Sequence, residues 1–155
     1  MVEHPSKDIV GSEGSELVGK KIALCITGSV AAYKSPDLAR ELMRLGAEVF
    51  CIMTQAAQKI IHPYLMEWAT GNKPILELDG KIDFISLSES EGRVDLVLIA
   101  PATANTIAKL ASGINDTPVT AVTIAAHGLG IPVLIAPAMH KSLSLIHISE
   151  PTRPR

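Results

Sequence analysis

Small polar side chains follow three of the four apolar stretches in this sequence, and a histidine follows the fourth. Thr27 to Ser29 come after the first stretch, Thr54 after the second, Thr103 and Asn105 after the third, and His140 after the fourth. Nucleophilic catalysis would need a nucleophile paired with its base. These weakly polar groups suit a bound cofactor better than such a pair.

The turn after the first stretch, "TGSVAAYK", has the form of an anion site. An apolar run from Ile22 to Ile26 ends at Gly28 and Ser29, and a helix-like pattern follows. Such a turn presents backbone N–H groups to an anion such as phosphate. The stretch contains neither GxGxxG nor GxxxxGK[ST], so the turn alone predicts a phosphate without identifying it.

The apolar stretches themselves read as strands that are buried on both faces. They are residues 21–27, 48–54, 94–101 and 131–138. Between the first two, Leu38, Leu42 and Leu45 recur at helical spacing and Gly46 supplies a stop. Alternating strands and helices predict a parallel sheet covered on both sides. Ligands of such sheets bind at the carboxyl ends of the strands, where the polar residues stand.

Composition limits the other possibilities. A chain of 155 residues that is 47% hydrophobic can bury one substantial core. The net charge of -2 and the lack of a Lys/Arg cluster argue against nucleic acid as a partner. Cys25 and Cys51 lie in apolar runs, which favours buried thiols over a disulfide or a metal site, and suits a reducing cytoplasm.

Neither a signal peptide nor a membrane span is expected in this sequence. Residues 1–19 are polar and glycine-rich without a signal-peptide pattern, and we expect a mobile N-terminal extension. The apolar residues 119–139 are interrupted by His127, glycines and prolines, so we expect a helix and a strand there and no membrane span.

Three motifs resemble the flavin-containing cysteine decarboxylase family, and specifically its phosphopantothenoylcysteine decarboxylase domain in an archaeal-like version. They are "TGSVAAYK", "APATANTIAKLASGINDTPVT" and "PAMH". The resemblance covers residues 20–142. It implies an α/β domain, a three-layer sandwich with a parallel Rossmann/flavodoxin-like sheet, and it identifies the expected phosphate as that of FMN.

The resemblance also implies which residues hold FMN: Gly28, Ser29, Thr54, Ala102, Thr103, Ala104 and Asn105. Gly28 and Ser29 would meet the phosphate, Thr54 would add a hydroxyl bond, and Asn105 would bond the flavin or its ribityl chain. The alternative is that Thr103 caps a helix and Asn105 lies in its first turn.

The implied activity is that of an FMN-dependent carboxy-lyase. It would decarboxylate 4'-phosphopantothenoylcysteine, a small thiol, to 4'-phosphopantetheine in coenzyme A biosynthesis. In the family FMN oxidises the substrate thiol to a thioaldehyde, which serves as the electron sink for loss of CO₂. Met139 and His140 would bind substrate, and His140 is the catalytic candidate. Family members form homotrimers or trimer-based oligomers.

Two departures from the family pattern bear on the function: His140 follows Met139 where family members often have an asparagine, and the second departure keeps other functions open. Phe84 stands where the family has a catalytic histidine. A non-catalytic FMN-binding regulatory subunit, or a flavin prenyltransferase or reductase on the same fold, are therefore alternatives. Residues 143–155 resemble translated sequencing-adaptor sequence, and we expect a non-native tail there, in place of the family's cysteine-bearing lid.

Overall fold

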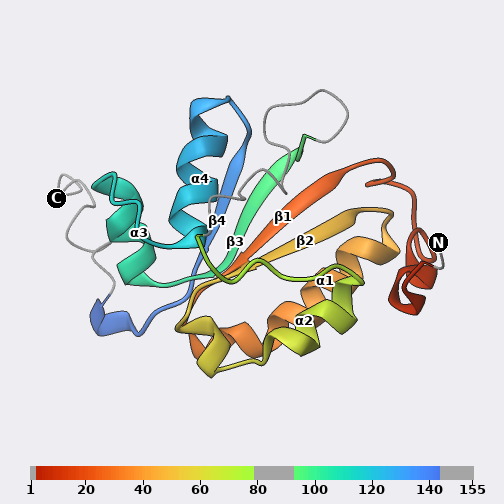
Figure 1. Ribbon diagram of the computed structural model, residues 1–155, viewed down its shortest axis with the longest axis horizontal. Coiled ribbons are helices and arrows are strands. Elements are labelled where there is room, and N and C mark those ends of the chain that lie inside the picture. The colour runs from red at the N-terminus through yellow and green to blue at the C-terminus, as the bar shows by residue number, and fades with distance from the viewer. Residues whose placement is uncertain (1–2, 79–92, 144–155) are drawn as a thin grey trace, which may run out of the picture.

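Four parallel strands form a single sheet in the computed structural model, which describes residues 3–78 and 93–143. The strand order is β2-β1-β3-β4 (Figure 1). The strands are β1 (Lys21–Ile26), β2 (Glu48–Met53), β3 (Leu96–Ala102) and β4 (Val133–Pro137). The predicted α/β class with a parallel sheet is confirmed.

The helices begin and end where the local sequence directs. They are α1 (Ser35–Arg44), α2 (Pro63–Thr70), α3 (Ala104–Ala111) and α4 (Pro118–Gly128), with short 3-10 turns η1 (Pro5–Ile9), η2 (Val30–Lys34), η3 (Ala57–Lys59) and η5 (Lys141–Leu143). A proline in the first turn opens α1, α2 and α4, where its missing N–H has no helical partner to lose. Gly71 closes α2 in the left-handed conformation.

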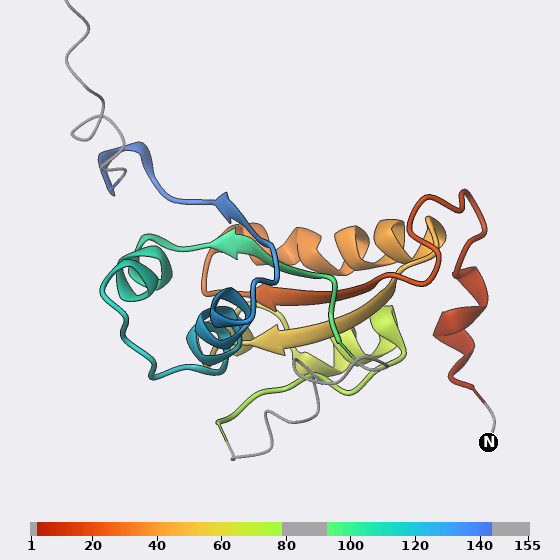
Figure 2. The same ribbon diagram turned by 90° about the horizontal axis from the view of Figure 1, so that it is seen from above.

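Helices cover both faces of the sheet and produce three layers. Along β1, Ile22, Leu24 and Ile26 belong to the core on the α1 side, whereas Ala23 and Cys25 belong to the core on the α4 side. Figure 2 shows α1 and α4 on opposite sides of the sheet. This alternation explains why β1 is apolar at successive positions.

Strand β4 is an edge strand, and the expectation that it is buried on both faces is wrong. Leu134 is 56% exposed and Ile135 is 38% exposed. Among the described strands, β4 has a neighbour on one side only. An apolar run therefore does not distinguish a covered strand from an uncovered edge.

Residues 3–19, within the expected N-terminal extension, pack against the domain in the structure. They lie along α1 and α2 and supply hydrogen-bond donors to the last carbonyls of α1: Gly11 N to Met43 O (2.9 Å), Glu13 N and Gly14 N to Arg44 O (3.1 and 3.2 Å), and Leu17 N to Leu45 O (2.9 Å). Ile9 and Leu17 pack against the core. The end of α1 needs such donors, because its last carbonyls have no partner within the helix.

Two expectations concern parts of the chain that are not described. Phe84 lies within residues 79–92, and the expected tail, apart from its first residue, lies within residues 144–155. Within the described ranges, no helix is long and apolar enough to cross a bilayer.

Candidate functional site

The carboxyl ends of the four strands meet in one row. Backbone hydrogen bonds join neighbouring ends: Thr54 N to Ile26 O (3.1 Å), Thr27 N to Pro101 O (3.3 Å) and Ala138 N to Ala102 O (2.9 Å). The chain leaves β1 toward β2 on one side, while β3 leads to β4 on the other, so the strand order reverses between β1 and β3. Ligands of open parallel sheets bind at such a switch point.

The turn after β1 lies close against the turn after β2. A Cβ atom on Gly28 would stand 2.5 Å from Ala56 Cβ, so glycine permits this approach. Ser29 caps η2, its Oγ accepting a hydrogen bond from Ala31 N at 3.2 Å. The helix-like pattern predicted after the turn is therefore a 3-10 turn that leads into α1.

Thr54 lies at the end of β2 beside this turn. It is 7% exposed, and its Oγ1 accepts a hydrogen bond from Ala57 N at 3.1 Å. A hydroxyl that accepts in this way retains its own hydrogen for a second partner. The Thr54 hydroxyl can therefore donate a hydrogen bond to a ligand at the end of β2.

The turn after β3 delivers Ala102, which is buried, followed by the start of α3. Thr103 is the N-cap of α3: its Oγ1 accepts from Thr106 N at 3.2 Å and donates to Thr106 Oγ1 at 3.1 Å. Asn105 is exposed in the first turn. The Thr103 side chain therefore caps α3, as the alternative interpretation predicted. The groups left for a ligand are the N–H groups of the first turn of α3 and the Asn105 amide.

Thr27 and Ser35 bond the end of β1 and the start of α1 to β3 and the turn that follows it. The sequence places Thr27 at a strand end but does not indicate these bonds, and it gives Ser35 no role. Thr27 Oγ1 donates to Pro101 O at 2.6 Å and accepts from Thr103 N at 3.0 Å. Ser35 Oγ donates to Ala100 O at 3.2 Å. A hydroxyl residue at the end of an otherwise apolar strand is the feature that places Thr27 among the strand-end residues.

Met139 and His140 follow the end of β4. Met139 is half-buried and His140 is exposed. His140 Nδ1 lies 2.7 Å from Ser142 Oγ and accepts from Ser142 N at 3.3 Å, so the ring is held by the turn that follows. The bond from Ala138 to Ala102 places this pair near the turn after β3.

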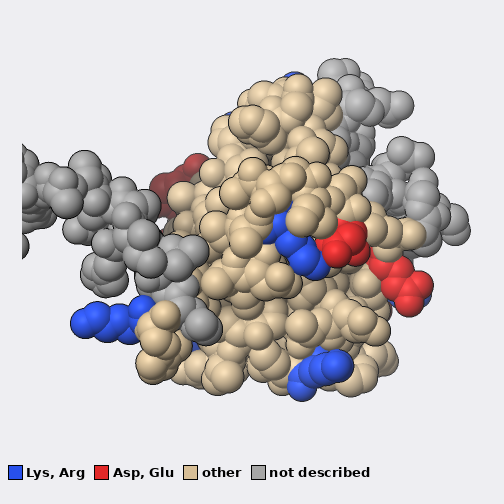
Figure 3. Space-filling model, turned by 90° about the vertical axis from the view of Figure 1, so that its left-hand side faces the viewer, with Lys and Arg blue, Asp and Glu red and all other residues tan. Residues whose placement is uncertain are grey.

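The face that carries the strand ends has few charged side chains (Figure 3). Neutral hydroxyl, amide and backbone N–H groups are thus the main polar groups at the row of strand ends. The two thiols are remote from solvent: burial raises the pKa of Cys25 to about 12, and burial together with the neighbouring Cys25 raises the pKa of Cys51 well above its usual range. Both thiols are protonated at neutral pH and are poor nucleophiles.

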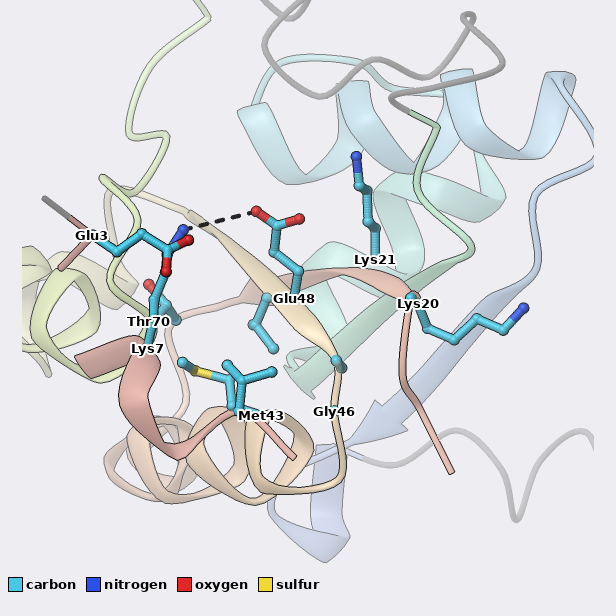
Figure 4. A pocket seen from close by; sticks show the side chains of 12 residues that line it. Glu3, Lys7, Lys20, Lys21, Met43, Gly46, Glu48 and Thr70 are labelled. Carbon is cyan, nitrogen blue, oxygen red and sulfur yellow. Dashed lines mark ion pairs between the residues drawn. The ribbon is translucent and has the colours of Figure 1, made fainter. Parts of the chain in front are cut away.

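Two hollows lie away from the strand carboxyl ends. One, of about 330 Å³, is at the opposite end of the sheet, where Lys7 Nζ lies 3.9 Å from Glu48 Oε1 (Figure 4). The other, of about 360 Å³, lies beside α2 and is lined by His62, Tyr64 and Lys73 among others. Neither hollow includes a residue of the strand-end row. The sheet topology and the polar groups, and not the hollows, therefore identify the candidate site.

Comparison with known proteins points to flavin chemistry. A family model described as Flavoprotein matches residues 10–149. The chain is 52% identical over 141 residues to the coenzyme A biosynthesis bifunctional protein CoaBC of Thermococcus kodakarensis, covering 90% of this chain and 35% of that relative. It is 40% identical over 129 residues to a probable phosphopantothenoylcysteine decarboxylase of Streptococcus mutans, covering 80% of this chain and 70% of the relative. The chain thus spans about a third of the bifunctional relative.

Solved structures agree in fold. The FMN-dependent cysteine decarboxylase SpaF superposes with a TM-score of 0.68 at 28% identity, covering 82% of this chain and 73% of SpaF. A C175S mutant of a PPC decarboxylase complexed with pantothenoylaminoethenethiol gives a TM-score of 0.59 at 25% identity, covering 80% of this chain and 69% of the other.

Proposed function

Because the chain belongs to the flavoprotein family, we propose that it binds FMN across the carboxyl ends of β1, β2 and β3. The observation that carries this proposal is the row of small and neutral polar residues at the switch point between β1 and β3. A flat, weakly polar ring system suits such a surface, and a phosphate suits the N–H groups of the adjoining turns.

The residues present fit this cofactor. Gly28 allows the turns after β1 and β2 to lie in contact, and Ala102 is buried at the end of β3. Ala104, half-buried at the start of α3, has only a methyl group, which leaves space beside that turn for a planar ring. Ser29 and Thr54 have hydroxyls beside the turn expected to hold the phosphate. Asn105 offers an exposed amide for polar atoms of the ring or ribityl chain.

The activity we propose is FMN-dependent decarboxylation of 4'-phosphopantothenoylcysteine in coenzyme A biosynthesis. Support comes from the names of the CoaBC and decarboxylase relatives. Bound FMN would supply the reversible two-electron oxidation of the substrate thiol that makes loss of CO₂ feasible. His140 would donate a hydrogen bond to the substrate carboxylate or transfer a proton, and Met139 would form an apolar wall beside it.

A regulatory, non-catalytic FMN-binding subunit is the second candidate. The observation that favours it is Phe84, at the position where the resembled family has a catalytic histidine. Loss of a general acid or base lowers a rate by about 10²- to 10⁴-fold.

We also propose that the active assembly is a homotrimer or an oligomer built from trimers, located in the cytoplasm. The exposed apolar residues of the β4 edge support association between copies. Two buried free thiols suit a reducing compartment.

The cofactor proposal is tested by adding FMN to the purified 155-residue chain. We expect a yellow protein with the absorbance bands of oxidised flavin, quenched FMN fluorescence on titration, and release of FMN on denaturation. A colourless protein that leaves the fluorescence of added FMN unchanged would contradict the proposal.

The choice between enzyme and regulatory subunit is tested by Phe84→His. For a decarboxylase, we expect CO₂ release from phosphopantothenoylcysteine to rise by about 10²-fold, with FMN affinity little changed. Both proteins are assayed with a native C-terminal lid in place of residues 143–155, and inactivity of both, with FMN bound, would then favour the regulatory subunit. High wild-type activity that Phe84→His leaves unchanged would instead assign the proton transfer to another residue, with His140 the first to test.

A further inference from the structure

The turn between β3 and α3 is attached to the rest of the sheet in an unusual way. Elsewhere in the strand-end row, backbone groups alone join the neighbouring ends, as between Thr54 and Ile26 (3.1 Å) and between Ala138 and Ala102 (2.9 Å). Between β1 and β3 the backbone bond, Thr27 N to Pro101 O, is longer, at 3.3 Å. The shorter bonds at this junction are made by the Thr27 side chain.

The Thr27 hydroxyl bonds the turn on both sides of Ala102. It donates to Pro101 O at 2.6 Å and accepts from Thr103 N at 3.0 Å, so one oxygen atom spans the turn. Thr27 is 1% exposed, and water is therefore a poor substitute for either partner. Ser35, which is 2% exposed, adds a third bond from α1 to Ala100 O at 3.2 Å.

This turn is where the proposed cofactor contacts of β3 are located. Ala102 and Thr103 follow directly, and Ala104 and Asn105 begin α3. The pairing of β3 with β1 is regular up to Ile99, and its pairing with β4 shifts register between Ile99 and Ala102. The hydroxyl of Thr27 adds two bonds between β1 and the turn to the backbone bond from Thr27 N to Pro101 O.

We infer that Thr27, supported by Ser35, is a positioning residue that holds the β3–α3 turn at the distance from the first turn that the flavin cofactor requires. The inference rests on the proposed FMN site. Thr27 does not need to touch the cofactor, because it acts through the main chain of Pro101 and Thr103. Binding affinity depends on such preorganisation, since a site that must be ordered on binding loses affinity to the cost of ordering.

The test is Thr27→Val, which keeps the shape and removes the hydroxyl, with Thr27→Ser as the rescue. The matched control is Thr70→Val at the end of α2. Thr70 is also 1% exposed, its Oγ1 donates to Met66 O at 2.9 Å, and it accepts from Asn72 N at 3.1 Å. The control therefore loses a similar pair of buried bonds far from the strand-end row.

FMN dissociation constants are measured by fluorescence quenching with the 155-residue proteins at a temperature where all are folded. We expect Thr27→Val to weaken FMN binding by about tenfold, and to alter the visible circular dichroism of bound flavin. We expect Thr27→Ser to restore both, and Thr70→Val to change affinity by less than about twofold. Equal affinities for wild type and Thr27→Val, or an equal loss in Thr70→Val, would overturn the inference.

Amide hydrogen exchange of the apoproteins separates this inference from the cofactor proposal. Exchange at Thr103 should be faster in Thr27→Val than in wild type and Thr27→Ser, whether or not FMN is the ligand. Unchanged exchange would overturn the positioning role. If wild type fails to bind FMN while exchange responds as expected, the cofactor proposal is wrong and the effect on affinity falls with it.

Discussion

Gly28 brings the first and second turns of the candidate site together, and its replacement should show how much that contact matters. In Gly28→Ala the new Cβ would stand 2.5 Å from Ala56 Cβ, so one of the two turns must move. We expect unfolding to become easier by about 1–3 kcal/mol, together with a large loss of FMN affinity. Thermal unfolding and FMN titration measure the two effects.

Gly128→Ala is the control for Gly28→Ala. A Cβ at Gly128, the last residue of α4, would meet no atom within 4 Å. Unchanged stability and FMN affinity are expected there. If Gly28→Ala behaves the same way, the turns are not in the contact that the structure shows.

The buried thiols predict a dependence of stability on alkaline pH. Burial raises the pKa of Cys25 from 9.0 to about 12 in the folded chain, while the unfolded thiol keeps its ordinary value. Above about pH 9 the unfolded state therefore binds fewer protons than the folded state, and stability falls as pH rises. Each such thiol lowers the free energy of unfolding by about 1 kcal/mol per pH unit above pH 9, and below pH 9 its stabilising contribution is fully present.

Denaturant unfolding of wild type and Cys25→Ala between pH 8 and 10.5 measures this effect. The slope with pH above 9 should be smaller in Cys25→Ala, whatever its absolute stability, because lysines and tyrosines titrate alike in both proteins. Parallel slopes would show that Cys25 does not hold its proton in the folded chain.

Prediction from sequence succeeded at the residue scale where strand ends determine position. Thr54, Thr103 and His140 were expected at the ends of strands, and the structure places them there. Sequence did not reveal that Thr27 bonds across to the β3–α3 turn. Each of these threonines follows an apolar run, and a hydroxyl's partner depends on which strands become neighbours.

At the scale of elements, Gly46, just after α1, lets the N-terminal segment pack closely against the end of that helix. Gly46 has φ +106°, and a Cβ there would lie 2.6 Å from Val18 Cγ2 and 2.8 Å from Val18 N. Gly46→Ala should therefore combine backbone strain with overlap against main-chain atoms, and cost more than about 2 kcal/mol of unfolding free energy. Chemical denaturation provides the measurement.

Gly113→Ala separates strain from overlap. Gly113 has φ +68° with no atom within 4 Å of the added carbon, so only the conformational cost of about 1 kcal/mol applies. A Gly46→Ala protein no less stable than Gly113→Ala would mean that Val18 does not pack against this turn.

The hydrophobic pattern predicted which segments form strands and helices, but it did not predict how deeply each one is buried. The four strands and the helix between the first two were predictable, because burial on both faces removes polar positions from a strand. The same criterion misplaced β4, since Leu134 and Ile135 are apolar yet exposed in this chain. Residues 3–19 have no such pattern, and backbone donors together with the apolar anchors Ile9 and Leu17 attach them to the domain.

At the scale of the whole molecule, the exposed β4 edge makes an isolated monomer unexpected. The strand register pairs Leu134 with Leu98 and Ile135 with Ile99, so the two exposed side chains extend both faces of the core to the edge. An uncovered apolar edge strand also presents unpaired backbone groups to other chains. We therefore expect light scattering at micromolar concentration to show the proposed trimer or a multiple of it.

Leu134→Glu tests whether β4 mediates that association. The side chain is 56% exposed in the single chain, so a carboxylate there should change monomer stability by less than about 1 kcal/mol. Within an interface the same carboxylate would lose its water, and the cost of burying an unpaired charge should shift the protein to monomers. Leu65→Glu, on α2 beside the opposite edge of the sheet and 49% exposed, should leave the oligomer intact if β4 forms the contact. Dissociation by Leu65→Glu and not by Leu134→Glu would place the apolar contact elsewhere. A wild-type monomer would leave β4 as an edge that the chain tolerates in water.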